Sequence, residues 1–412
     1  MNAGAIKEKY FLWLILFIYI ASLFFNSQLA PQKRADEQIS VPKYVFGDGL
    51  YYLLLTENII NNGRFYIYDN INEVKGTLKL SGFSLGAGGK IYITFSPLYS
   101  ILLIPAYFAS GVFGAYLFNA FLGFATCYFI YRTCRLFVAK GPAVDTTIIF
   151  SLGTIIFTYS EVIYAEVLTA FLTTSAVYFT FLYSVDKTRL YIVASGLFSG
   201  MLLLAKPSLA VIPCSLIIYS IAKNRLNGIF SLAFPIALSV CLFFAYNLAE
   251  SGSPLKTGYS SEIIVYDAGN SVIDHGDRIF WSNNPVKTIP GILLLMFATQ
   301  PILLVSLAGI IQNWKRGEVK YVAFLSFALL FLYSLRFNPI GLWCWSTRLL
   351  TPIIPLLAVP FALAYERSQV GKNVVLILAV ISIILTIFSL APVSWHLFTQ
   401  MPISNWIYYE PF

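Results

Sequence analysis

Apolar segments of membrane-spanning length dominate this sequence and leave little of the chain for anything else. Eleven segments come close to the roughly 20 residues, about 17–25 in practice, that a helix needs to cross a bilayer. They are 10–30, 115–137, 144–160, 165–184, 190–205, 208–222, 228–249, 289–313, 319–336, 348–365 and 373–391. We therefore predict an all-α polytopic membrane protein in which residues 1–412 form a single transmembrane domain.

The composition excludes several classes of protein. The chain is 58% hydrophobic and 11% charged, whereas soluble domains average about 45–50% apolar and about 25% charged residues. A water-soluble enzyme, a disordered chain and a nucleic-acid-binding module are all excluded, so we expect membrane lipids and no nucleic acid as partners. The net charge of +8 bears on membrane sidedness, because Lys and Arg gather on the cytoplasmic side.

Sidedness depends on a twelfth apolar stretch, 97–113. If it lies in the interface, or re-enters the membrane, the basic clusters of the short loops all fall on one side, as the positive-inside rule requires. These clusters are Lys7/Lys9, Arg132/Arg135/Lys140, Lys187/Arg189, Lys223/Arg225, Lys315/Arg316/Lys320 and Arg367/Lys372. We predict a plasma (inner) membrane protein with a cytoplasmic N-terminus. Its large outer segments are a first loop at 31–114 with interfacial helices, a second loop at 250–288 and a C-terminal tail at 392–412.

Ionisable residues avoid the centres of the predicted spans and gather at their outer ends. They are Asp48, Glu161, Glu166, Lys206, Glu250, Arg336 and Arg348. Transporters driven by ions place such groups near the bilayer midplane, and a charge there is costly and usually functional. This distribution favours a site at the outer membrane–water boundary, where a lipid head group lies.

Asp48 and Arg348 each have a functional and a structural interpretation. Asp48 begins a predicted amphipathic helix at 48–60, ended by Asn-Asn-Gly at 61–63. It could act as a general base near an apolar boundary, or simply cap the helix. Arg348 follows two Trp residues and could bind a phosphate with its planar guanidinium, or anchor a span at the interface. Arg336 is a similar candidate, and Lys206 could snorkel.

Glu161 and Glu166 lie between two predicted spans. They could supply a second acidic group that orients an acceptor or shares a proton or cation with Asp48, or they could form a polar turn. The two histidines, His275 and His396, have no ligand at zinc spacing. No phosphate-binding loop occurs either. We predict no cofactor, leave a divalent cation open, and infer a lipid-borne substrate because no soluble nucleotide-sugar domain is present.

Four motifs give the chain a family resemblance. They are GDGLYY at 47–52, GKIYITFSPLY at 89–99, GSPLKTGY at 252–259 and GLWCWSTRLLTPIIP at 341–355. With them the chain resembles the GT-C superfamily of membrane glycosyltransferases, which take polyprenyl-phosphate sugars as donors. Within it, the sequence looks most like the protein O-mannosyltransferases and the lipid A aminoarabinose transferases. The resemblance implies a GT-C-like fold of about 11 transmembrane helices with an interfacial helix in the first outer loop.

The resemblance also implies roles for individual residues. Asp48 and Glu166 take the catalytic acidic positions, with Asp48 as the base. Arg348 becomes a contact of the donor phosphate. Our predicted substrate-binding residues are Arg348, Lys90, Tyr51, Tyr52, Glu161 and Tyr259. The chain departs from the family pattern where a lysine is replaced by Thr94 and a proline by Ser96, which shifts the phosphate-binding load to Arg348 or Lys90.

The predicted function is transfer of a sugar from a polyprenyl-phosphate donor to a hydroxyl of a glycan, lipid or protein at the extracytoplasmic face. Attack on the anomeric carbon in line with the leaving phosphate would invert its configuration. One alternative is a lipid-linked glycan flippase or small-solute transporter without catalysis. Another is a polymerase or ligase that acts on a diphosphate-linked oligosaccharide.

Overall fold

The computed structural model describes most of the chain. The described residues are 3–28, 47–70, 73, 80–224, 226–265, 272–274, 284–336, 340–341, 344–367 and 371–390. The predicted tail at 392–412 and both histidines lie outside them. So do parts of the two predicted outer loops, 31–114 and 250–288.

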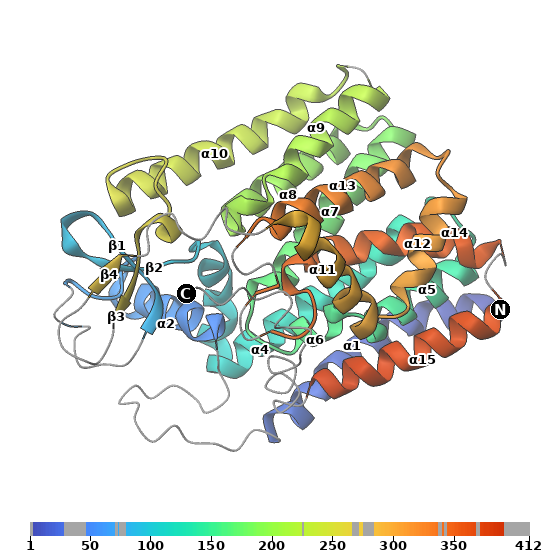
Figure 1. Ribbon diagram of the computed structural model, residues 1–412, viewed down its shortest axis with the longest axis horizontal. Helices are drawn as coiled ribbons and strands as arrows, with labels where there is room; N and C mark the ends of the chain where they lie inside the picture. Colours follow the sequence, from blue (N-terminus) through green and yellow to red (C-terminus); the bar gives the residue numbers. More distant parts are fainter. Residues whose placement is uncertain are drawn as a thin grey trace.

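Helices make up the body of the protein (Figure 1). They are α1 (Ala3–Gln28), α4 (Leu98–Cys134), α5 (Lys140–Gly153), α6 (Ile155–Ser160), α7 (Ala165–Val185), α8 (Arg189–Ala205), α9 (Val211–Asn224), α10 (Ile229–Ser251), α11 (Pro285–Thr299), α12 (Leu303–Gln312), α13 (Gly317–Ser334), α14 (Ala358–Glu366) and α15 (Lys372–Ser389). The buried helix α7 lies at the centre, against α4, α8 and a 3₁₀ segment, η4 (Arg348–Leu357).

Each of the eleven predicted spans corresponds to one helix or to two consecutive ones. Among the described residues, six helices are long and apolar enough to cross a membrane, or seven spans if a bent pair counts as one. The polytopic, predominantly helical architecture is confirmed, and the lengths support six or seven crossings. Helices such as α8 and α9 are apolar but shorter, so eleven crossings remains a prediction.

Prolines divide two of the predicted spans. Segment 289–313 is two helices, α11 and α12, bent by 115°, because Pro301 has no amide hydrogen and disfavours helical geometry at Gln300. Segment 348–365 starts as the 3₁₀ segment η4, which contains Pro352 and Pro355, and continues as α14.

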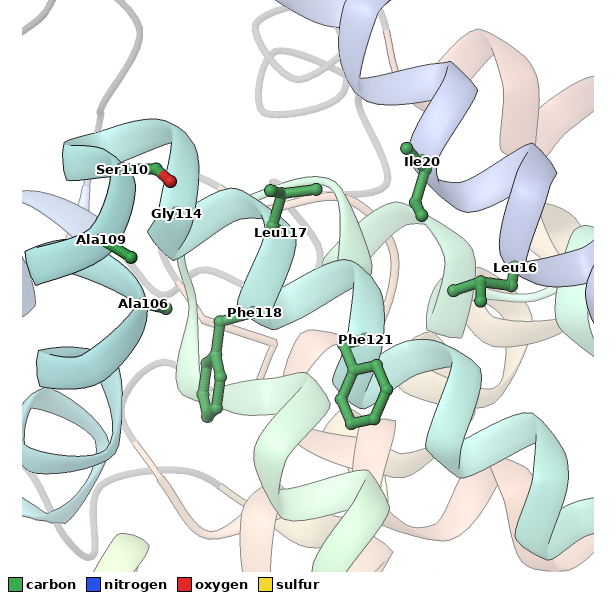
Figure 2. A pocket seen from close by; sticks show the side chains of 9 residues that line it. All are labelled: Leu16, Ile20, Ala106, Ala109, Ser110, Gly114, Leu117, Phe118 and Phe121. Carbon is green, nitrogen blue, oxygen red and sulfur yellow. The ribbon is translucent and has the colours of Figure 1, made fainter.

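Helix α4 is broken between its two halves. Ser110 (φ −148°) and Gly111 (φ 60°) leave helical geometry, so 98–109 forms a segment of its own, as the interfacial interpretation of 97–113 requires. The chain turns back sharply here (Figure 2). A Cβ on Gly114 would lie 1.9 Å from the Ala106 carbonyl oxygen. Together with α1, the two halves line an apolar cavity of about 430 Å³.

A small antiparallel sheet corrects the all-α prediction. Its strands are β1 (Leu80–Leu85), β2 (Ile91–Ile93), β3 (Glu262–Val265) and β4 (Val272–Asp274), in the order β2-β1-β3-β4. Short 3₁₀ segments adjoin it, η1 (Ala87–Gly89) and η3 (Gly258–Ser261). The sheet joins the first predicted outer loop to the second and lies beside α2 (Asp48–Asn62) at one end of the bundle (Figure 1).

Candidate active site

Arg348, at the start of η4, is held by carboxylates from two other elements. Its Nε donates to Oε1 of Glu166 at 2.8 Å, and its Nη2 donates to Oδ2 of Asp48. The guanidinium carbon lies 4.3 Å from the centroid of the Tyr164 ring. The structure thus brings together three residues that the sequence predicted for the site, although Asp48 and Arg348 are 300 positions apart.

Glu166 binds a second cation. Its Oε1 also accepts from Nζ of Lys206 at 3.2 Å, and its side chain is 2% exposed. A buried carboxylate needs such partners, because removing one side of a buried ion pair costs about 3–5 kcal/mol. Asp48 is the accessible corner of the cluster, with a side chain 21% exposed. Asp48 is thus more exposed than Glu166, Lys206 and Arg348. We call these four residues, Asp48, Glu166, Lys206 and Arg348, the ion-pair cluster.

Each charged side chain is placed by an element end. Gly47 (φ 59°) precedes Asp48, and a Cβ at Gly47 would lie 2.1 Å from the Tyr164 hydroxyl. The cap position of α2 belongs to Gly47, and the Asp48 carboxylate contacts Arg348, so the capping interpretation of Asp48 is not supported. Glu166 lies in the first turn of α7, where the helix dipole favours a negative charge. Arg348 is buried, 7% exposed, and is not a simple interfacial anchor.

Two predicted tyrosines lie within electrostatic reach of the cluster. Burial raises the pKa of Tyr52, and the nearby Tyr259 and Asp48 raise it further. Burial also raises the pKa of Tyr259, which Arg336 opposes and Asp48 reinforces. Both rings pack on Phe95, with centroid distances of 5.3 Å for Tyr52 and 6.1 Å for Tyr259. The rings of Tyr52, Phe95 and Tyr259 therefore form an aromatic wall beside the ion-pair cluster.

Tyr51 and Lys90 lie on the sheet side. The Tyr51 ring packs edge-on against Phe83 at 5.4 Å. Nζ of Lys90 lies 4.1 Å from the centroid of the Tyr66 ring. Over the described ranges, no hydrogen bond or ion pair joins Lys90 to the ion-pair cluster, and its predicted role in phosphate binding stays a prediction.

Glu161 occupies a separate buried place between α6 and α7. It is 0% exposed, and its carboxyl lies near the hydroxyls of Tyr19 and Tyr116. Burial raises the pKa of Glu161 to about 8, against a hydrogen bond from Ser22 that lowers it. Its predicted role in substrate binding has no support from this position and stays a prediction.

Glu161 should make the stability of the protein depend on pH. A carboxyl whose pKa rises from an ordinary 4.5 to about 8 on folding stabilises the fold fully below pH 4.5. That contribution is lost at about 1.4 kcal/mol per pH unit as the pH rises toward 8. The melting temperature of the wild type should therefore fall as the pH rises from 5 to 9. The melting temperature of Glu161→Gln should fall much less over the same range. The control is Glu73→Gln, which changes an exposed carboxyl and should behave like the wild type. Equal loss of melting temperature with pH in Glu161→Gln and the wild type would contradict the raised pKa of Glu161.

Three features of the site were missed from the sequence. Lys206, for which snorkelling was one interpretation, pairs with Glu166. Tyr164, whose ring stacks on Arg348, was not among the predicted site residues. Glu250 accepts from Ser84 Oγ at 3.0 Å and ties α10 to β1. Within the described part of the chain, no group of three or more His, Cys, Asp or Glu side chains could hold a metal ion.

Comparison of sequences finds no relative. No family model matches the chain, and no curated protein matches it.

Comparison of structures does find similar proteins. The structure of ArnT from Cupriavidus metallidurans bound to undecaprenyl phosphate matches with a TM-score of 0.56 at 12% identity, over 96% of this chain and 74% of that one. The apo ArnT structure matches with a TM-score of 0.54 at 14% identity, over 86% of this chain and 60% of that one.

An archaeal oligosaccharyltransferase has the same fold. The Archaeoglobus fulgidus enzyme, in complex with zinc and sulfate, matches with a TM-score of 0.57 at 14% identity, over 96% of this chain and 57% of that one. The chain thus spans less than two thirds of this enzyme and of apo ArnT. At these identities the likeness concerns the fold alone: this chain folds like ArnT and the archaeal oligosaccharyltransferase, in agreement with the predicted GT-C-like fold.

Proposed function

We propose that this protein transfers a sugar from a polyprenyl-phosphate donor to a hydroxyl acceptor. The observation that carries the proposal is the buried Arg348 fork, held between Glu166 and the accessible Asp48 beside an aromatic wall. A guanidinium in this arrangement suits a phosphate oxygen. The shared fold supports a lipid phosphate as its ligand, because ArnT was solved with undecaprenyl phosphate and the archaeal AglB with a dolichol-phosphate.

In this mechanism, binding of the donor phosphate releases Asp48 from Arg348, so that Asp48 can act as the base. The donor phosphate takes the place of Asp48 at Nη2 of Arg348, while Glu166 keeps its hold on Nε. Asp48 then faces the acceptor hydroxyl and accepts its proton. The acceptor oxygen attacks the anomeric carbon, and the bond from that carbon to the phosphate oxygen breaks with its electron pair on the leaving polyprenyl phosphate. Asp48 passes the proton to water, and the sugar is inverted.

Arg348 contributes most as the leaving group departs. The phosphate is a diester with a single negative charge in the donor, and as a free monoester it carries about −1.5 to −2 charges at pH 7. A preorganised cation stabilises charge that develops in the transition state more than charge present from the start. The fixed Arg348 therefore favours bond breaking over mere binding.

The extracytoplasmic side of the plasma (inner) membrane is the proposed location of the site. The short basic loops support a cytoplasmic N-terminus, and Asp48 follows the first helix on the opposite side. Strands β1 and β2 of the first loop and β3 and β4 of the second meet in the sheet beside α2. We expect these two loops to shape the pocket for a glycan, lipid or protein acceptor.

A deletion strain tests the function. Mass spectrometry of its envelope glycans should show one sugar missing and the matching polyprenyl-phosphate sugar accumulated. Wild-type protein should restore the sugar, and the Asp48→Asn variant, produced at the same level, should not. Restoration by Asp48→Asn would favour a flippase or transporter, which needs no base.

Glu166 is expected to act by positioning Arg348. Glu166→Gln keeps the shape but removes the charge that fixes Nε of Arg348, so kcat/KM for the donor should fall about 10- to 100-fold, by analogy with outer partners of site ligands. The matched control is Glu318→Gln, which breaks an ion pair to Lys223 of similar length, 3.0 Å. Steady-state kinetics with varied donor check this, and equal kinetics for both variants would contradict the positioning role.

A further inference from the structure

The charges of the ion-pair cluster balance. Asp48 and Glu166 supply two negative charges, and Arg348 and Lys206 supply two positive ones. Without Lys206 the cluster would carry a net negative charge and would repel an arriving phosphate. The Lys206 charge therefore keeps the cluster neutral.

Proton transfer to Asp48 changes the net charge of the cluster in the same step in which the phosphate leaves. When Asp48 accepts the acceptor proton, it becomes neutral, and the cluster gains one net positive charge. In the same step the leaving phosphate gains one negative charge. With Lys206 present the cluster goes from neutral to cationic, whereas without it the cluster would only go from anionic to neutral. Electrostatic stabilisation of the leaving phosphate thus depends on the Lys206 charge.

The position of Lys206 suits contact with a phosphate at Arg348. The residue lies between α8 and the 3₁₀ segment η2 (Pro207–Leu209), because Pro207 cannot continue the helix. Its side chain is 15% exposed, and its ammonium has three N–H groups, one of which binds Glu166. The ammonium and Nε of Arg348 share the same carboxylate oxygen, Oε1 of Glu166. The two cations therefore lie side by side.

The segment that follows strand β2 also lies at the end of α8, near Lys206. Ser96 Oγ donates to the Leu204 carbonyl, so the 94–96 segment lies against the end of α8. A Cβ on Gly258 would lie 2.5 Å from the Thr94 carbonyl oxygen, which brings Tyr259 to the same spot. Thr94 itself brings no charge, and Lys90 stacks on Tyr66. Lys206 thus places an ammonium beside segment 94–96, which has no positively charged side chain of its own.

We propose that Lys206 is a further phosphate-binding residue, which holds the donor phosphate together with Arg348. This inference rests on the proposed function. It extends the site to a residue that the sequence left to lipid contact.

The experiment measures the dissociation constant of undecaprenyl phosphate for the purified full chain in detergent, with undecaprenol as the uncharged probe. Lys206→Met should weaken binding of the phosphate about tenfold or more, the effect of one lost charged hydrogen bond, and leave undecaprenol binding unchanged. Lys206→Arg, which keeps the positive charge, should bind the phosphate more tightly than Lys206→Met. The matched control, Lys223→Met, removes a lysine from the ion pair with Glu318 and should bind normally.

A double variant separates contact from support of Glu166. If Lys206 only balances the Glu166 charge, Lys206→Met should have no effect in a Glu166→Gln background. If it contacts the phosphate, the loss persists there. The double variant also leaves no unpaired buried carboxylate, so it serves if Lys206→Met fails to fold. Normal phosphate binding by the double variant, relative to Glu166→Gln alone, would overturn the inference.

Arg348→Lys in the same assay separates this inference from the proposed function. Weak binding by Arg348→Lys together with normal binding by the Lys206 variants would overturn the Lys206 assignment alone. Normal binding by all of these variants would overturn the proposed phosphate site itself.

Discussion

Asp48→Asn should abolish sugar transfer while leaving the fold intact. Asn keeps the shape of the side chain and can still contact Arg348, but it cannot accept the acceptor proton. A positioned general base contributes about 10²- to 10⁴-fold to the rate, so kcat should fall by at least about 10²-fold. The initial rate of transfer from a polyprenyl-phosphate sugar in detergent, with a melting curve of the same preparation, measures both parts.

A second readout distinguishes this base from a merely structural carboxylate. In the proposed mechanism the donor phosphate displaces Asp48 from Nη2 of Arg348, which Asp48 contacts in the structure. Asp48→Asn should therefore bind undecaprenyl phosphate more tightly than the wild type. Asp69→Asn is the matched control, because Asp69 pairs with Arg64 at 3.4 Å on the exposed surface and should change neither value. Near-normal turnover by Asp48→Asn would end the general-base assignment.

Arg348→Lys should cost the protein most of its use of the donor. Lysine keeps the positive charge, but a single ammonium cannot hold Glu166 and a phosphate in the fixed geometry of the guanidinium fork. Loss of one preorganised donor at a developing charge costs about 2.7–4 kcal/mol. We therefore expect kcat/KM for the donor to fall about 10²- to 10³-fold.

Substitution of Arg348 by lysine tests phosphate binding more specifically than substitution by alanine. Arg348→Ala would leave the buried Glu166 with Lys206 as its one remaining partner, and breaking a buried pair costs about 3–5 kcal/mol of folding stability. The matched control is Arg132→Lys, because Arg132 donates to the Tyr128 hydroxyl at 2.7 Å and stacks on the same ring. If Arg348→Lys and Arg132→Lys show the same donor kinetics, Arg348 does not bind the phosphate.

The helices could be predicted because their signal is local. A run of apolar residues specifies a membrane helix without reference to the rest of the chain. The left-handed Gly63 that ends α2 likewise follows from Asn61 and Asn62 before it. The break at Ser110 agrees with the separate segment predicted at 97–113. The bend at Gln300 was missed, because 289–313 was predicted as one span although Pro301 is a local helix-breaking signal.

The contacts of the site could not be predicted in the same way. The residue types at positions 48, 166 and 348 suggested acid–base chemistry and phosphate binding, and the family resemblance supported these roles. Their meeting, however, depends on how α2, α7 and η4 pack, across separations of up to 300 positions. Lys206 in particular looks like any lysine at the end of an apolar helix until Glu166 is placed beside it.

The sheet was missed for a different reason. Strands β2 and β4 have three residues each, too few for an alternating pattern to stand out. They exist because segments from two distant loops pair through β1 and β3, and such pairing leaves little trace in either segment alone. Within β1, Gly82 (φ 98°) allows close packing against the Tyr51 ring.

A structure of the full chain with undecaprenyl phosphate tests most directly whether Arg348 exchanges Asp48 for the donor phosphate. We predict a phosphate oxygen within about 3 Å of an Arg348 nitrogen, with the Glu166 contact kept and the Asp48 carboxylate turned toward the acceptor side. A phosphate bound elsewhere, with Asp48 still paired to Arg348, would contradict the proposed mechanism.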